Sequence, residues 1–336
     1  MSMDRQSRVM RGLWLALVWV MFGGAAQAAD GDAYTGIQGT TLRFATIAQG
    51  RAVLGTEDEW VAATSEFQRV ALVGGAGPVS RAQLLAFTVD TVQPWSAQQE
   101  ARWRKALDAI APRLAALRIP LPAEVWIVNT DGRDAANAPY TRANAVMLPM
   151  ATLGAKPGDT AADARLLAHE LFHVASRHAP ALASRLYATL GFEPVAPLQW
   201  PADWLPARIV NPDAPRDGHA MPVTISGRAA LVMPVLMASR TTLKPGESFF
   251  NVTEVRMLEV LTVAGRPTQP VMRDGQPVWL PPGSVPDFLD KLGGNTGYII
   301  HPEETMSDNI ALLVTNQPAR NMALLKQIEA VLLAPR

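Results

Sequence analysis

Residues 166–178, LLAHELFHVASRH, contain the side chains of this chain best suited to bind a metal ion. His169 and His173 flank Glu170 in the pattern HExxH. On an α-helix, side chains four positions apart lie on one face, so both imidazoles can reach the same ion. Glu170, one position beyond the first histidine, can take a proton from a water on that ion without binding the ion itself. The pattern therefore predicts a water-activating metal site whose remaining ligand lies elsewhere in the chain.

Two other histidines are poor choices for that ligand. His178 follows His173 by five positions, which places it about 140° away around a helix. The longer pattern HExxHxxGxxH is absent, and we expect His178 to interact with the dipole at the helix C-terminus. His219 stands in the turn-rich segment DGHAMP and is expected to be structural or exposed.

A better source of the third ligand is the segment YIIHPEETMSDNIALL, residues 298–313, in which a proline opens a predicted helix. Acidic residues in the first turn of a helix commonly complement its dipole, and this explanation remains open. Glu304 and Asp308, however, are four apart and share one face. The first can bind the ion while the second accepts the free ring N–H of a ligand histidine. Glu303 in place of Glu304 stays open as the ligand, and His301 is a further alternative.

Together these residues resemble the gluzincins, the thermolysin-like zinc metallopeptidases that combine HExxH with a downstream ExxxD. The resemblance implies one zinc ion bound by His169, His173 and Glu304. It also implies that Glu170 is the general base and that Asp308 hydrogen-bonds a ligand histidine. The match covers only two short helices, and the two halves are much further apart in sequence than in thermolysin.

The residue that would stabilise an oxyanion in such an enzyme has no motif in this chain. Tyr298 and His301 precede the second predicted helix and are the catalytic candidates, although Tyr298 also fits a core position and His301 a loop position. The prediction is hydrolysis of a peptide or protein substrate by water on the zinc ion. Two alternatives are a catalytically inactive envelope binding protein on a zincin scaffold and a zinc-dependent hydrolase of other amides or esters. A GxSxG serine elbow is absent.

Composition narrows the class of protein further. The 336 residues are 49% hydrophobic and 18% charged, with a formal net charge of zero, which gives no basic surface for nucleic acid. The chain contains no cysteine. Disulfides, thiolate ligands and cysteine nucleophiles are therefore excluded, and a metal site has to be built from His, Asp and Glu.

The first 29 residues are typical of a cleaved export signal. Arg5, Arg8 and Arg11 precede an apolar run over residues 13–22, and Ala26 and Ala28 form a small-x-small cleavage pattern. A spanning helix needs about 20 apolar residues, more than this run provides. We therefore expect a Sec-type signal peptide, a periplasmic or secreted protein, and no stable membrane span after cleavage.

The elements that would position the site indicate an α+β fold. We expect a zincin-like core in which the motif helix packs against a small mixed sheet, followed by a β-rich insertion and C-terminal helices. The corresponding parts are residues 30–191, 192–283 and 284–336. The predicted strand at 144–150 is an edge where an extended peptide could pair. The predicted elements are strands at 41–48, 122–130, 144–150 and across 223–280, and helices at 58–70, 97–117 (with Pro112 as a kink or break), 160–178, 181–190, 284–292, 302–314 and 321–333.

Overall fold

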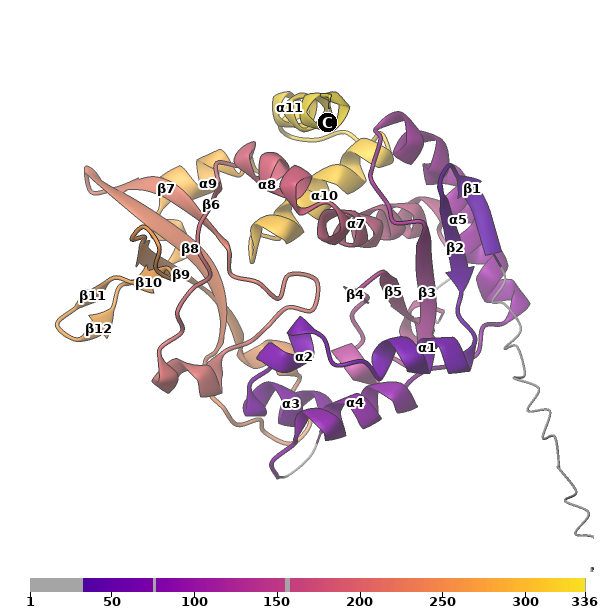
Figure 1. Ribbon diagram of the computed structural model, residues 1–336, viewed down its shortest axis with the longest axis horizontal. Coiled ribbons are helices and arrows are strands. Elements are labelled where there is room, and N and C mark those ends of the chain that lie inside the picture. The colour runs from indigo at the N-terminus through magenta and orange to yellow at the C-terminus, as the bar shows by residue number, and fades with distance from the viewer. Residues whose placement is uncertain (1–32, 75–76, 155–157, 336) are drawn as a thin grey trace, which may run out of the picture.

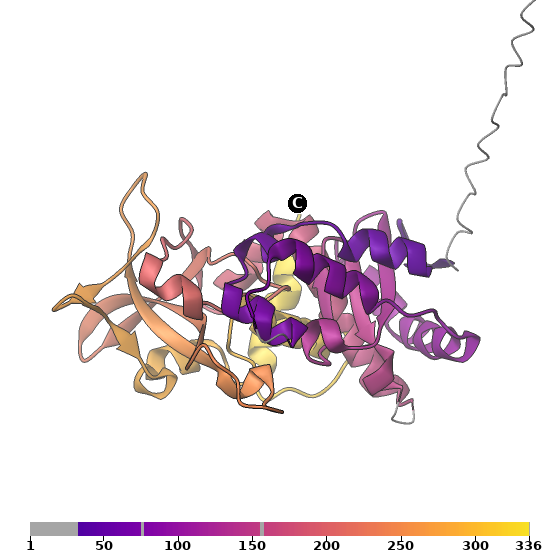
Figure 2. The ribbon, with the colours of Figure 1, turned by 90° about the horizontal axis from the view of Figure 1, so that it is seen from below.

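The computed structural model describes residues 33–74, 77–154 and 158–335, so the predicted signal peptide lies outside the described residues. The chain forms a mixed α+β structure in which helices and a five-stranded sheet make one part and an antiparallel sheet makes the other (Figure 1). Viewed from below, the second sheet lies to one side of the helices (Figure 2). The predicted α+β class is therefore confirmed.

The first sheet has the strand order β1-β2-β3-β5-β4. β2, β3 and β5 run parallel, whereas β1 and β4 pair antiparallel at the two edges. Successive side chains of a strand point to opposite faces, and here one face meets α5 and α7 while the other meets α1 and α4. The strands are β1 (Ala33–Ile37), β2 (Thr40–Phe44), β3 (Glu124–Thr130), β4 (Tyr140–Arg142) and β5 (Ala145–Pro149).

Three predictions for this part of the chain were wrong in detail. The strand expected at 41–48 ends at Phe44, because Thr46 caps a helix that begins at Ile47. The helix expected at 58–70 is two helices, since Ser65 accepts a hydrogen bond from the Gln68 N–H and starts a new one. The strand at 144–150 is not an edge, because β4 pairs along its outer side.

The helices that carry the predicted motifs end close to the expected residues. α5 (Ala97–Ala116) continues through Pro112 without a break, and α7 (Thr160–His178) begins after Asp159, whose side chain accepts from the Ala161 N–H. The remaining helices are α1 (Ile47–Leu54), α2 (Glu59–Ala63), α3 (Glu66–Val73), α4 (Arg81–Asp90), α6 (Met150–Leu153), α8 (Pro180–Ala188), α9 (Pro286–Lys291), α10 (Pro302–Val314) and α11 (Met322–Leu333).

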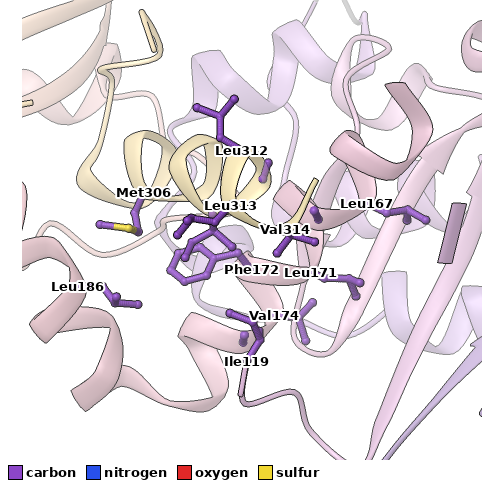
Figure 3. Packing of buried hydrophobic residues seen from close by; sticks show 14 of the residues in the cluster. Ile119, Leu167, Leu171, Phe172, Val174, Leu186, Met306, Leu312, Leu313 and Val314 are labelled. Atoms are coloured by element: carbon purple, nitrogen blue, oxygen red, sulfur yellow. The ribbon is translucent and has the colours of Figure 1, made fainter. Parts of the chain in front are cut away.

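A continuous apolar core fixes α7 against its neighbours. Leu167 and Leu171 on α7, Leu186 on α8 and Ile310 on α10 are fully buried in it. Figure 3 shows side chains of these three helices meeting in one cluster. Because protein cores are close-packed, this cluster sets the distance between α7 and α10, and so between the two halves of the predicted site.

The second sheet lies within residues 192–283 and is antiparallel, as the strand pattern of this region predicts. Its order is β10-β9-β8-β7-β6, and β13 also pairs with β9. Among the described residues, no helix is long and apolar enough to cross a membrane. The strands are β6 (Glu193–Pro194), β7 (His219–Ile225), β8 (Arg228–Ala238), β9 (Thr253–Leu261), β10 (Gln269–Pro270) and β13 (Trp279–Leu280), and β11 (Met272–Arg273) pairs with β12 (Gln276–Pro277).

Candidate metal centre

α7 and α10 bring three donor side chains to one point. The Nε2 atom of His169 lies 3.2 Å from the Oε2 atom of Glu304, and the Nε2 atom of His173 lies 3.4 Å from the same oxygen. Donors on one tetrahedral zinc ion are about 3.3 Å apart, since each bond is about 2.0–2.1 Å long. His169, His173 and Glu304 are therefore spaced as ligands of a single metal ion.

Each ligand histidine is held by a carboxylate on its other ring nitrogen. The Nδ1 atom of His169 lies 3.1 Å from Asp308 Oδ1, and the Nδ1 atom of His173 lies 2.7 Å from Glu303 Oε1. With the Nδ1–H donated to a carboxylate, each Nε2 atom presents a lone pair to the common point. Three acceptor atoms then face one another, an arrangement that a bound metal ion or an added proton stabilises.

Glu303 orients the ring of His173 and is not one of the three donors. Its carboxylate accepts a hydrogen bond from Ser176 Oγ at 2.6 Å and another from the Tyr187 hydroxyl, besides its contact with His173. Both of its oxygens are thereby occupied. The structure thus separates two neighbouring acids: Glu304 faces the common point, and Glu303 faces the back of the His173 ring.

The charges around the centre match a cation-binding site. Burial acts to raise the pKa of Glu304, but His173 and His169 outweigh burial and lower it well below its usual range. Burial acts to lower the pKa of His169, but its hydrogen bonds to Asp308 and Glu304 outweigh burial and raise it to about 9. In the metal-free protein a proton therefore takes the cationic role that a metal ion would fill.

Glu170 lies beside the donor set with a free acceptor atom. Its Oε2 atom and the Nε2 atom of His173 are both buried and make no hydrogen bond. Burial, followed by the nearby carboxylate of Asp213, raises the pKa of Glu170 to about 8. A carboxylate with such a pKa can both accept and release a proton near neutral pH, as a general base must.

The two catalytic candidates before α10 have different surroundings. The Tyr298 ring stacks beside that of His169, with centroids 6.2 Å apart, and the side chain stays 42% exposed. Burial and the carboxylates of Glu304 and Asp213 raise its pKa, so the phenol remains a hydrogen-bond donor. His301 instead caps α10: its Nδ1 atom accepts from the Glu303 N–H, and its Nε2 atom lies 3.3 Å from the Arg216 carbonyl oxygen. Both of its ring nitrogens are thus engaged in structural contacts.

The remaining two histidines lie away from the donor set. His178 is exposed at the end of α7. His219 is 3.0 Å from Ser184 Oγ through Nε2, and its ring meets Tyr187 edge-on at 4.9 Å. Burial lowers the pKa of His219 to about 4, so it is neutral at physiological pH.

Sequence reasoning missed the two residues that approach the centre from the Pro-rich connector. Asp213 has a carboxylate oxygen within 4.8 Å of donor atoms of both Glu170 and His173. The Asn211 amide donates to Oε1 of Glu304 and accepts from the Asp213 N–H at 3.1 Å, which fixes the way it faces. The only local signal was the turn sequence NPDAP, which indicates a loop but not which residues that loop contacts.

A cavity of about 360 Å³ opens beside the centre, against Asp213, Glu303 and the end of α7. Its size lies within the usual range of about 300–1,000 Å³ for ligand pockets. A larger cavity of about 600 Å³ lies between α5, α7 and the end of α10. None of the three donors lines either cavity, but Glu303 and Asp213, which contact or approach the donors, line the smaller one.

No protein-family model, curated protein or solved structure matches this chain.

Proposed function

We propose that this protein is a zinc-dependent metallopeptidase of gluzincin type, exported by the signal peptide predicted over residues 1–29. One observation carries the proposal. The Nε2 atoms of His169 and His173 converge on Oε2 of Glu304 at the spacing of a tetrahedral zinc site, beside the unpaired carboxylate oxygen of Glu170. Two imidazoles and one carboxylate are a common catalytic zinc ligand set, because they leave a fourth position for water or substrate.

The neighbouring side chains can perform the proton transfers of peptide hydrolysis. A zinc ion held by the three donors would polarise the substrate carbonyl and lower the pKa of a bound water toward about 7. Glu170, whose Oε2 atom is buried and unpaired beside the donors, would hold the proton released by the attacking water and pass it to the leaving amine. Tyr298, kept protonated, is the candidate donor of a hydrogen bond to the oxyanion.

The fold supports a place for an extended peptide, although not the place first expected. β4, rather than β5, is the edge strand beside α7, and it runs antiparallel to its neighbour. An edge strand offers unpaired backbone groups to an incoming peptide. We therefore propose a zincin-like core in which substrate pairs with β4 and one of its side chains enters the cavity of about 360 Å³.

Chelation provides the direct test of this function. The purified protein should contain about one zinc ion per chain, and the wild type or a variant in which Asp213 no longer reaches the site should cleave members of a peptide library. Treatment with a zinc chelator should abolish cleavage, and added Zn²⁺ should restore it, because the reaction needs the ion. A protein that contains iron instead of zinc, or that cleaves peptides equally well after complete metal removal, would contradict the proposal.

Metal uptake should also release protons. Since the pKa of His169 is about 9 in the metal-free protein, its ring is protonated at pH 7 and must lose that proton to bind zinc. Burial acts to lower the pKa of His173, but the carboxylates of Glu304 and Asp213 outweigh burial and raise it as well, so the apparent zinc affinity should rise with pH, about tenfold per unit for each proton released. Calorimetry in buffers of different ionisation enthalpy measures the number of protons. An affinity that is flat between about pH 6 and pH 9 would contradict this assignment.

One observation favours a second function, a binding protein that holds zinc without cleaving peptides. Asn211 and Asp213 lie within the site and contact or approach its donors. A segment held there permanently would prevent substrate entry. Stoichiometric zinc without cleavage of any library peptide, in the wild type and in variants that release this segment, would favour the binding protein. The same library extended with simple esters and non-peptide amides tests the alternative hydrolase activity.

A further inference from the structure

Residues 211–217, NPDAPRD, run beside the candidate metal centre, and residues 212–216 line the cavity of about 360 Å³; we refer to residues 211–217 as the crossing segment. In Figure 1 the loop that leads into β7 reaches the middle of the molecule, between α2 and the pair of helices α7 and α10. Pro212 and Pro215 restrict the backbone of this segment. The segment therefore belongs in sequence to the connector before the second sheet, but in space to the site.

Contacts with four different elements hold the crossing segment in place. Arg216 forms an ion pair with Glu59 at the start of α2, and its carbonyl oxygen lies 3.3 Å from the ring of His301. Arg177 of α7 donates to the carbonyl oxygen of Asp213 at 3.3 Å. The Asn211 amide donates to Glu304 on α10. The fourth element is β4, which the Asp213 side chain binds.

The Asp213 carboxylate lies between the edge strand and the metal donors. Its Oδ1 atom accepts from the Thr141 N–H at 2.6 Å and from the Thr141 hydroxyl at 2.7 Å. Another of its contacts is electrostatic: it faces His173 and Glu170, with an oxygen within 4.8 Å of a donor atom of each. Carboxylate oxygen is an ordinary zinc ligand, and the oxygen of Asp213 lies within 4.8 Å of a donor atom of His173, one of the three proposed ligands.

We propose that Asp213 is a fourth protein donor to the bound metal ion and that the crossing segment keeps the centre closed to substrate. This inference rests on the proposed zinc-dependent function. Counted as direct donors, two neutral imidazoles and two carboxylates match the charge of a dication. A zinc site with four protein donors is closed, and a catalytic one needs an open position.

The contact between Asp213 and Thr141 also blocks the strand edge to which a peptide substrate would pair. Thr141 is fully buried, and its N–H, which an extended peptide would need at the edge of β4, is bonded to Asp213. Movement of the crossing segment would free the metal position and the strand edge together. The resting chain is thus latent, and displacement of residues 211–217 activates it.

Metal titration of Asp213 variants tests this inference without relying on activity. Asp213→Ala should weaken zinc binding by at least about tenfold, since even losing a group that only orients a ligand typically costs 10- to 100-fold. With Co²⁺ in place of zinc, the visible bands of the variant should differ from those of the wild type, because a carboxylate leaves the ligand set. Peptide cleavage by Asp213→Ala should exceed that of the wild type.

Two further variants make the result decisive. Asp213→Asn keeps an oxygen to accept from Thr141 but removes the charge, so it replaces Asp213→Ala if the alanine variant does not fold. Asp217→Asn makes the same chemical change in the same segment, at a side chain that bonds Trp200 and Arg208 instead of the centre. It should match the wild type in zinc affinity and in the Co²⁺ spectrum.

The outcomes separate this inference from the proposed function. If the Asp213 variants bind zinc as tightly as the wild type with the same Co²⁺ spectrum, Asp213 is not a ligand and the inference fails while the metal centre stands. Cleavage that falls in these variants would overturn latency and make Asp213 part of the catalytic machinery. If the wild type and Asp217→Asn bind neither ion, the proposed function itself is wrong, and the inference falls with it.

Discussion

Glu170→Gln should lower peptide hydrolysis by at least about 10²- to 10⁴-fold, the usual contribution of a general acid–base group. The amide has nearly the same shape as the carboxylate but cannot accept and return the proton. Glu170 is absent from the donor triad His169, His173 and Glu304, so the variant should keep its zinc. The measurement is kcat/KM on a cleavable library peptide, together with zinc content per chain.

The loss of hydrolysis in Glu170→Gln has to be measured in a chain whose site is open to substrate. If Asp213 holds the enzyme latent, Glu170→Gln should be measured in the Asp213→Ala chain as well as alone. Glu193→Gln, an exposed residue of β6, serves as the matched control and should leave the rate unchanged. Full activity in the Glu170 variant would remove the proposed mechanism, whereas loss of zinc would assign Glu170 to metal binding.

Glu304→Ala should have the largest effect on metal content. It removes one of three donors, so the zinc dissociation constant should increase by more than the roughly 10- to 100-fold expected when a group that orients a ligand is lost. Glu303→Gln should fall within that smaller range, because Glu303 contacts the back of the His173 ring. Competition with a chromogenic chelator measures both variants on one scale.

These two substitutions also settle which of the neighbouring acids binds the ion. A greater loss of affinity in Glu303→Gln than in Glu304→Ala would exchange their roles. Thermal unfolding of the metal-free variants is the necessary control, since Glu303 also holds Ser176 and Tyr187 in the core. Equal melting temperatures would show that the affinity difference arises at the metal and not from the loss of packing.

The local parts of the site were predictable because short-range signals define them. Asp159 and Pro302 mark the starts of α7 and α10, and both helices have the bounds that the sequence predicts. The HExxH spacing and the four-residue step from Glu304 to Asp308 follow from the helix period alone. The donors on α7 and α10 also face each other because the apolar sides of these helices pack together. The helical spacing of those apolar residues is visible in the sequence.

The features that the sequence did not predict depend on contacts between residues far apart in the chain. β4 has only three residues, too few for an alternating pattern, so its edge position and the interior position of β5 came only from the structure. Asp213 reaches the centre through a turn-rich loop, which carries no periodicity. Glu303 and Glu304 differ by about 100° around one helix, so a small rotation decides which of them faces the histidines.

The separation of the donors along the chain has a consequence for stability. His169 and Glu304 are 135 residues apart, and the whole second sheet lies in the segment between them. An ion bound by both would act as a cross-link that closes a very long loop of the unfolded chain. For a disulfide, closing a loop of about 100 residues is worth about 4.7 kcal/mol in the chain-entropy model. Because the chain has no cysteine, no disulfide can supply such a cross-link, and the metal would fasten α7 to α10 across the long segment that forms the second sheet.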